Sequence, residues 1–158
     1  MTKEIQLTKG QVALVDDEDY EYLSQWKWHY SGGYAMWRSH INGVKTTLLM
    51  HRLIMNTPDG LETDHINSNK LDNRRGNLRI STKPQNSANK PAPKNNTSGY
   101  KGVSWFKAGK LWTARLKVNG KLIYCGYFKN IEDAVIAYNT EAKKHLGEFV
   151  YPNLQVEG

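Results

Sequence analysis

The sequence predicts an α+β fold built from short antiparallel strands and a few short helices. The chain has 158 residues, which allows one or two small domains and excludes a large enzyme. Apolar and polar residues alternate over several stretches of strand length, and the dipeptide Asn-Gly, which favours hairpin turns, occurs at 42–43 and 119–120. Apolar residues also recur at helical spacing over 131–146.

Residues 1–50 form a small mixed segment that is rich in aromatic side chains. Residues 11–15 are a short apolar strand candidate, and the acidic residues that follow suit the start of a helix. Aromatic strand candidates run over 26–30 and 33–41, and the turn at 42–43 leads into the next apolar stretch. We expect three tryptophans of this segment to pack as a platform for the rest, with stacking on nucleic-acid bases as the alternative (Trp26, Trp28 and Trp37).

The next segment is polar, rich in Asn, and predicts a β-β-α unit. Residues 60–65 and 77–81 are strand candidates joined by a loop whose many Asn residues favour turns. Ser81 or Thr82 can cap a short helix that has Pro84 in its first turn and carries Asn86.

The C-terminal part predicts a second module. Residues 91–98 have the composition of a linker. Within 99–154, three antiparallel strands are predicted, with the central strand at 111–118, followed by a helix that Asn130 can cap. Alternation divides the central strand between a face that packs under the helix (Trp112, Ala114, Leu116 and Val118) and a solvent face (Thr113, Arg115 and Lys117).

The charge distribution favours a polyanionic partner. The formal net charge is +7, and residues 1–56 are neutral, with six basic and six acidic residues. Residues 98–130 hold seven basic residues and no acidic one. A basic balance concentrated in the C-terminal two-thirds indicates nucleic acid first, although a basic soluble surface is the plainer reading.

The cysteine count and the hydropathy of the chain bear on its cellular compartment and on the kinds of site it can form. The single cysteine, Cys125, excludes an intrachain disulfide and a Cys-rich zinc site. No apolar run approaches the ~20 residues of a membrane span, and the N-terminus has no apolar signal segment. We therefore expect an intracellular protein with no membrane partner.

Residues 64–86 carry the candidate chemistry. Asp64 and the Asn86 side-chain carbonyl are hard oxygen donors, which suit Mg²⁺ or Mn²⁺ and allow the cation to polarise a phosphate. His65 titrates near neutral pH and can take a proton from an attacking water, while Asn77 can hold the loop and fix the imidazole tautomer. This pattern indicates phosphodiester hydrolysis, but an Asp-His pair is common and Asn-rich loops are most often turns.

The segment "MHRLI" followed by "DHINSNKLDNRRGNLRISTKPQN" resembles the HNH endonuclease family, in its phage and intron-homing branch with an H-N-N pattern. The resemblance spans roughly 48–90 and implies a ββα-metal core, within an endonuclease domain over 1–90. By resemblance, Asp64 and Asn86 hold a single divalent cation, His65 is the general base and Asn77 supports the motif. His51 belongs to the "HRL" helix, with a structural or phosphate-contacting role. Family members that bind a structural zinc carry extra pairs of Cys residues. This chain has no such pairs, so no structural zinc is expected.

Residues 98–154 are similar to the AP-two, or ethylene-response-factor, DNA-binding domain of plants, through "YKGV", "GKLWTARL", "GYF", "EDAVIAYN" and "PNL". That family lays a three-stranded sheet in the major groove of DNA. The resemblance implies DNA contacts by Lys101, Arg115, Lys117 and Tyr124, with Trp105, Lys107 and Lys121 as weaker candidates. Ser104 and Leu122 stand where the family has sheet arginines, so the site read is expected to differ from the plant one.

Together the two resemblances imply an endonuclease that acts on double-stranded DNA, leaves 5′-phosphate and 3′-hydroxyl ends, and works as a monomer or a dimer. The resemblance to a phage branch also implies a protein of the bacterial cytoplasm, encoded by the bacterium or by a phage. Two other classes stay open. One is a DNA-binding regulator with an idle nuclease site, and the other is an RNA-binding or structural protein that uses the aromatic N-terminal segment.

Overall fold

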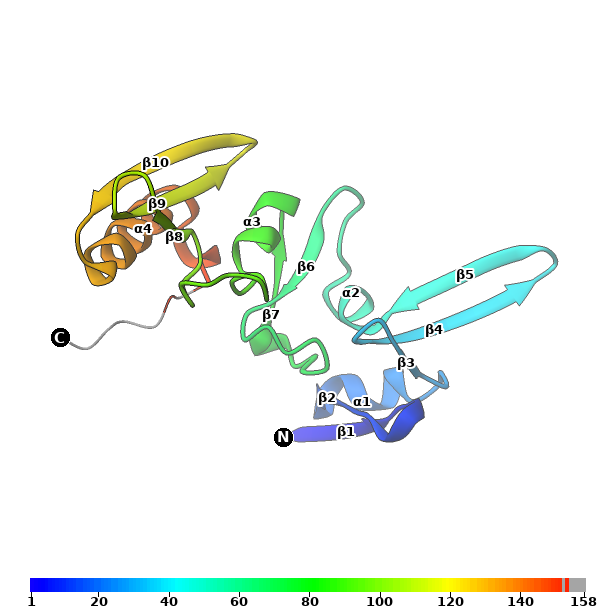
Figure 1. Cartoon of the computed structure of the whole chain (residues 1–158). Helices are drawn as coiled ribbons and strands as arrows, with labels where there is room; N and C mark the ends of the chain where they lie inside the picture. The colour runs from blue at the N-terminus through cyan, green and yellow to red at the C-terminus, as the bar shows by residue number, and fades with distance from the viewer. Residues whose placement is uncertain (152, 154–158) are drawn as a thin grey trace. The chain divides into compact units, whose positions relative to one another are not determined.

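The computed structural model describes residues 1–151 and 153. The chain divides into two compact units, Met1–Lys83 and Pro84–Gly158. The described strands form four small antiparallel sheets (Figure 1). This arrangement confirms the mixed α and β class.

The first unit opens with a hairpin of β1 (Thr2–Gln6) and β2 (Val12–Asp16), followed by helix α1 (Asp17–Leu23). The short 3-10 turn between the strands spans Thr8–Gly10. Strand β1 was not predicted, because four of its five residues are exposed and only Ile5 is buried. Its sequence therefore lacks the apolar alternation that marks a strand.

A second sheet of the first unit contains β3 (His29–Ser31), β4 (Tyr34–Ile41) and β5 (Val44–Leu49) in the order β3-β4-β5. Asn42 and Gly43 join β4 to β5 with φ of 52° and 79°. Positive φ at both positions is what a two-residue hairpin turn of type I′ requires, so the predicted turn is confirmed. Helix α2 (Met50–Met55) follows, and Asn56 ends it in the left-handed conformation.

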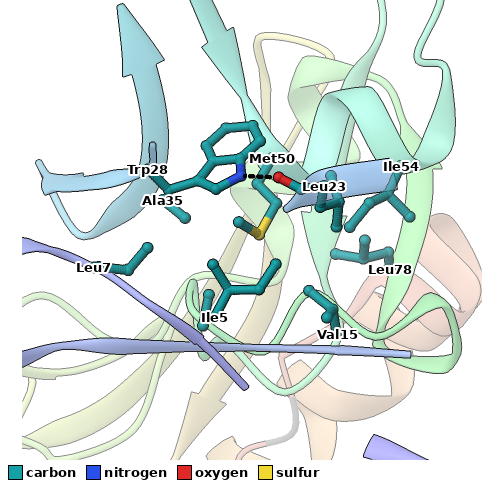
Figure 2. Packing of buried hydrophobic residues seen from close by; sticks show 10 residues of the cluster. Ile5, Leu7, Val15, Leu23, Trp28, Ala35, Met50, Ile54 and Leu78 are labelled. Carbon is teal, nitrogen blue, oxygen red and sulfur yellow. Dashed lines mark hydrogen bonds between the residues drawn. The ribbon is translucent and has the colours of Figure 1, made fainter. Parts of the chain in front are cut away.

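The core of the first unit gathers apolar side chains from β1, β2, α1, α2 and β7 (Figure 2). Trp28 is 2% exposed, and its indole Nε1 donates a hydrogen bond to the Leu23 carbonyl at 2.8 Å. Trp26 and Trp37 are partly buried against the same cluster. The three tryptophans therefore pack as a platform, as expected, and Trp28 has no face to offer to a base.

The candidate chemistry lies on the hairpin of β6 (Glu62–His65) and β7 (Leu78–Ser81). The register places Asp64 opposite Arg79 and His65 opposite Leu78. A short 3-10 turn, Arg75–Asn77, leads into β7, and helix α3 (Lys83–Ala88) follows it. Two strands and a helix thus occur in the predicted order.

The second unit contains β8 (Val103–Phe106), β9 (Leu111–Val118) and β10 (Lys121–Phe128), with β9 in the centre of the sheet. Helix α4 (Ile131–Leu146) packs against one face, and a short 3-10 turn, Gly147–Phe149, follows. Three strands and one helix confirm the predicted arrangement. The core is formed by side chains of β8, β9 and α4 (Val103, Ala114, Leu116, Ala134, Val135, Tyr138 and Ala142).

Contacts of the segment before β8 attach it to the second unit. The Tyr151 backbone N–H donates to the Ala88 carbonyl at 3.1 Å. The Asn96 side chain organises the next turn, because its Oδ1 accepts from the Ser98 and Gly99 backbone N–H groups. The independence of a domain over 99–154 stays a prediction, and its expected end at Leu154 lies outside the described residues.

Candidate functional site

The Asn-rich loop between β6 and β7 is fixed to the N-terminal hairpin. Leu14 of β2 donates its N–H to the Leu71 carbonyl and accepts from the Asn73 N–H, both at 2.8 Å. Arg75 adds a clamp to α1, since its guanidinium binds both carboxylate oxygens of Asp19 at 2.8 and 2.7 Å. The loop is therefore fixed to β2 by an isolated parallel bridge between Leu14 and Asp72, which gives its side chains defined positions.

Asn73 holds the imidazole of His65. The His65 Nε2 lies 2.9 Å from the Asn73 Oδ1, and the Asn73 amide nitrogen donates to the Met50 sulfur at 3.4 Å. Because the amide oxygen faces the ring, Nε2 carries the hydrogen and Nδ1 keeps the lone pair. Asn73 is fully buried and His65 is 5% exposed, so this tautomer is set inside the protein. Such an imidazole can take up a proton at Nδ1.

Asn77 shapes the loop. Its amide donates to the Asp72 carbonyl at 2.8 Å, and its Oδ1 accepts from the Asn67 backbone N–H at 3.0 Å. Asp72 is itself buried, and the hydrogen bonds from Arg74 hold the pKa of its carboxyl below the usual value. Asn77 was expected both to hold the loop and to fix the imidazole tautomer. In the structure Asn77 holds the loop, whereas Asn73 contacts the imidazole of His65.

Asp64 forms a buried ion pair with Arg79. The guanidinium Nε and Nη2 lie 2.9 and 2.8 Å from the Asp64 Oδ2, and the two side chains are 5% and 13% exposed. The surroundings of the Asp64 carboxylate therefore already stabilise a positively charged group beside it. Asn86, the other expected metal ligand, is half-buried on α3 in the second unit, and its joint role with Asp64 stays a prediction.

A cluster of rings surrounds His65. The rings of His51 and Tyr34 have centroids 5.0 and 6.2 Å from that of His65, and the Lys70 ammonium lies 4.4 Å from the centroid of the Tyr34 ring. His51 is 5% exposed, and its Nδ1 has no hydrogen-bond partner among the described residues. The buried position supports the structural reading of His51 in the "HRL" helix.

Burial governs the ionisation of both histidines. Desolvation, with nearby positive charges, lowers the pKa of His51 to about 3. Burial also lowers the pKa of His65, although the Asn73 hydrogen bond and the Asp64 charge act in the opposite direction. Both imidazoles are therefore neutral at pH 7.

In the second unit, the face of the sheet opposite α4 carries the expected DNA-binding side chains. Arg115 and Lys117 are exposed on β9, and Tyr124 lies opposite Arg115 on β10 and is 62% exposed. Lys107 and Lys121 are exposed at the ends of the strands, but Lys121 pairs with Val118, which lies on the side where α4 packs. Thr113 shares this face but is buried, which differs from the expectation that it faces solvent.

Two of the expected DNA contacts have other surroundings. The register pairs Trp105 with Trp112, on the face where α4 packs, and the two rings meet edge to face at 5.1 Å. The Lys101 ammonium donates to the carbonyls of Ser87, Ala88 and Lys90 at 3.2, 2.5 and 2.6 Å. Burial, with the charge of Lys90, lowers the Lys101 pKa to about 8. Lys101 thus secures the C-terminal end of α3, and its role on DNA stays a prediction.

No role was predicted for Arg79, and Asn73 was not predicted to be a partner of His65. Asn73 was read as part of the family pattern and of an Asn-rich loop, where an isolated Asn favours a turn. Arg79 had a recognisable signal, because a two-stranded pairing of 62–65 with 78–81 places it directly opposite Asp64.

Comparison with known proteins gives the family. A family model described as HNH endonuclease matches residues 49–88. Protein 3.8 of Escherichia phage T7 is 42% identical over 64 residues, which cover 40% of this chain and 53% of that protein. This chain thus spans about half of the phage protein's length. Uncharacterized HNH endonuclease L560 of Acanthamoeba polyphaga mimivirus is 31% identical over 150 residues, which cover 92% of this chain and 76% of that protein.

No solved structure matches the chain. Among the described residues, no helix has the length and apolar character needed to cross a membrane. The viral relative aligns along nearly the whole chain, and the family model covers the segment with the buried Asp64 and His65. The chain therefore belongs to the HNH endonuclease family, and the expectation of a nuclease is confirmed.

Proposed function

We propose that the protein is a DNA endonuclease that hydrolyses phosphodiester bonds with His65 as general base and one divalent cation. The observation that carries this proposal is the buried hydrogen bond between His65 Nε2 and Asn73 Oδ1, which favours the tautomer with the lone pair on Nδ1. A general base needs a defined tautomer and an unprotonated nitrogen at working pH. The hydrogen bond to Asn73 defines the tautomer of His65, and burial favours its unprotonated form.

The donor set fits a hard cation. Asp64 offers a buried carboxylate in surroundings that already hold a guanidinium, and Asn86, if it is the second ligand, would add an amide oxygen. Oxygen donors of this kind suit Mg²⁺ or Mn²⁺, with water and phosphate as the remaining ligands. When bound, such a cation polarises the phosphate and stabilises the leaving oxygen. Asp64 would yield part of its contact with Arg79, and the released guanidinium would be available to a phosphate oxygen.

A plasmid-cleavage assay tests the activity. We expect the full chain to nick or linearise supercoiled plasmid in Mg²⁺ and to be inactive in EDTA. Asp64→Asn keeps the side-chain volume but removes the charge that holds the cation, so it should lose Mg²⁺-dependent cleavage. Cleavage at the wild-type rate by Asp64→Asn, or in EDTA, would refute the metal assignment.

We propose further that the second unit positions the enzyme on DNA through the exposed face of β8, β9 and β10. On this face, Arg115 can read a guanine bidentately, which is worth about 1–3 kcal/mol of discrimination. Lys117 can neutralise a phosphate, and its loss should reduce the salt dependence by about one counterion. We therefore expect Arg115→Ala to relax sequence preference and Lys117→Ala to weaken binding evenly, measured on a randomised duplex pool at two salt concentrations. If Arg115→Ala kept the sequence preference of the wild type, Arg115 would not be a residue that reads the DNA sequence.

A further inference from the structure

The outer half of the β4–β5 hairpin lies in solvent on both faces. Strand β3 pairs with β4 only over Tyr34–Met36, and from there β4 and β5 run as a two-stranded ribbon to the turn at 42–43 (Figure 1). Over 38–47 every residue is exposed except Ser39, which is half-buried. A hairpin without a covered face is marginally stable by itself. Such a ribbon is therefore suited to a partner that covers it.

Pairing gives the ribbon two different faces. The pairs Arg38–Thr47 and His40–Lys45 lie on one face, because directly opposed residues point to the same side of a sheet. The other face carries the pairs Ser39–Thr46 and Ile41–Val44. Ile41 and Val44 are 64% and 63% exposed, beside the turn. One face is thus basic, and the other ends in an apolar tip.

The charge around the ribbon is of one sign. Residues 22–58 contain four Lys and Arg residues and three His residues, with no Asp or Glu. No carboxylate of this stretch can neutralise Arg38 or Lys45, which favours a polyanion as the partner. The major groove of duplex DNA is wide enough for a two-stranded ribbon, and apolar side chains there contact thymine methyl groups. A second copy of the chain would instead bring two basic ribbons together.

We propose that the β4–β5 hairpin is a second DNA-binding element, in which Arg38 and Lys45 contact phosphates while Ile41 and Val44 reach into a groove. This element belongs to the unit that carries Asp64 and His65, so it would hold that unit on the duplex by itself. The inference rests on the proposed function only in taking duplex DNA as the ligand.

Binding of the full chain to a 30-base-pair duplex without divalent cation tests the proposal, followed as a function of salt. The variant Arg38→Gln/Lys45→Gln should bind at least about fivefold more weakly at low salt, and its log–log salt slope should fall by about two, one counterion for each lost phosphate contact. Lys9→Gln/Lys27→Gln is the matched control. It removes the same charge from exposed positions of the same unit, outside the hairpin, and should change the slope far less.

The tip is tested by Ile41→Ser/Val44→Ser, which should weaken binding while leaving the salt slope unchanged. If the hairpin and control double variants weaken binding equally, the effect is one of net charge and the proposal is overturned. It is also overturned if the tip variant abolishes a dimer in sedimentation and leaves DNA binding intact. Wild-type protein that binds no DNA would refute the proposed function as well, whereas normal binding by all hairpin variants would refute only the hairpin.

Discussion

His65 depends on one neighbour for its orientation. Asn73 is fully buried, binds the imidazole at 2.9 Å and is itself fixed by Leu14 and Met50. An imidazole without this acceptor can rotate or change tautomer, and either change removes the lone pair from its position. Asn73 is therefore a positioning residue for the general base.

We predict that Asn73→Ala lowers the single-turnover cleavage rate by about 10²-fold, a loss within the range of general-base catalysis. Asn73→Asp keeps an oxygen acceptor opposite Nε2 and should retain more activity. Its carboxylate also favours the imidazolium, so the acid limb of the pH–rate profile should move to higher pH. A rate and profile in Asn73→Asp that match those of Asn73→Ala would show that the acceptor plays no part.

His51 should make stability sensitive to pH. Its pKa is lowered to about 3 in the folded state, while an unfolded chain has about 6.5. Below pH 6.5 the unfolded state therefore binds the additional proton, and stability falls as the pH decreases. At pH 5 this contribution reaches about 2 kcal/mol.

Urea unfolding at pH 7.5 and pH 5 measures this effect. His51→Gln cannot titrate, so its loss of stability between the two pH values should be about 2 kcal/mol smaller than that of the wild type. The groups that titrate elsewhere are common to both proteins and cancel in the comparison. Equal losses in the two proteins would show that His51 is not held neutral.

At the scale of elements, the sheet of the second unit depends on a glycine beside β8. Gly102 has φ of +75°, and a Cβ placed there would lie 2.0 Å from the Tyr138 ring and 2.6 Å from the Arg115 carbonyl oxygen. Gly99 has a similar φ of +79°, but a Cβ there meets nothing within 4 Å. The two positions thus share backbone strain and differ in packing.

We predict that Gly102→Ala destabilises the protein by about 1–3 kcal/mol more than Gly99→Ala, because overpacking is added to the cost of a positive φ. Thermal and urea unfolding of the two variants measure the difference. A loss as small as that of Gly99→Ala would mean that Tyr138 moves aside without cost.

Elements marked by local signals were predictable from the sequence. The turns at 42–43 and 119–120, the alternation on β9 and the amphipathic pattern of α4 are properties of a few neighbouring residues, and each of these elements is present. Strand β1 was not predictable in this way, because its pairing with β2 makes it a strand despite polar side chains. The face of Trp105 was also missed, since it depends on the register with β9.

At the scale of the whole molecule, some residues of the candidate site were predictable from a local motif, and others take their roles from long-range contacts. Asp64 and His65 stand out because they are adjacent in a motif. Asn73 and Arg79 acquire their roles through long-range contacts, with Leu14 of β2 and across the β6–β7 pair. The N-terminal hairpin therefore contributes to the site by fixing the loop, a role that no pattern within residues 1–16 indicates.

The central claim is that His65 takes the proton in phosphodiester hydrolysis. Single-turnover cleavage at saturating DNA and Mg²⁺ tests it, with binding measured separately. We expect His65→Ala to cleave about 10²–10⁴-fold more slowly while its DNA affinity stays near that of the wild type, because proton transfer and not binding is lost. The control His145→Ala removes an imidazole that lies beside Glu141 on α4, and should cleave normally. Cleavage by His65→Ala at the wild-type rate would contradict the assignment.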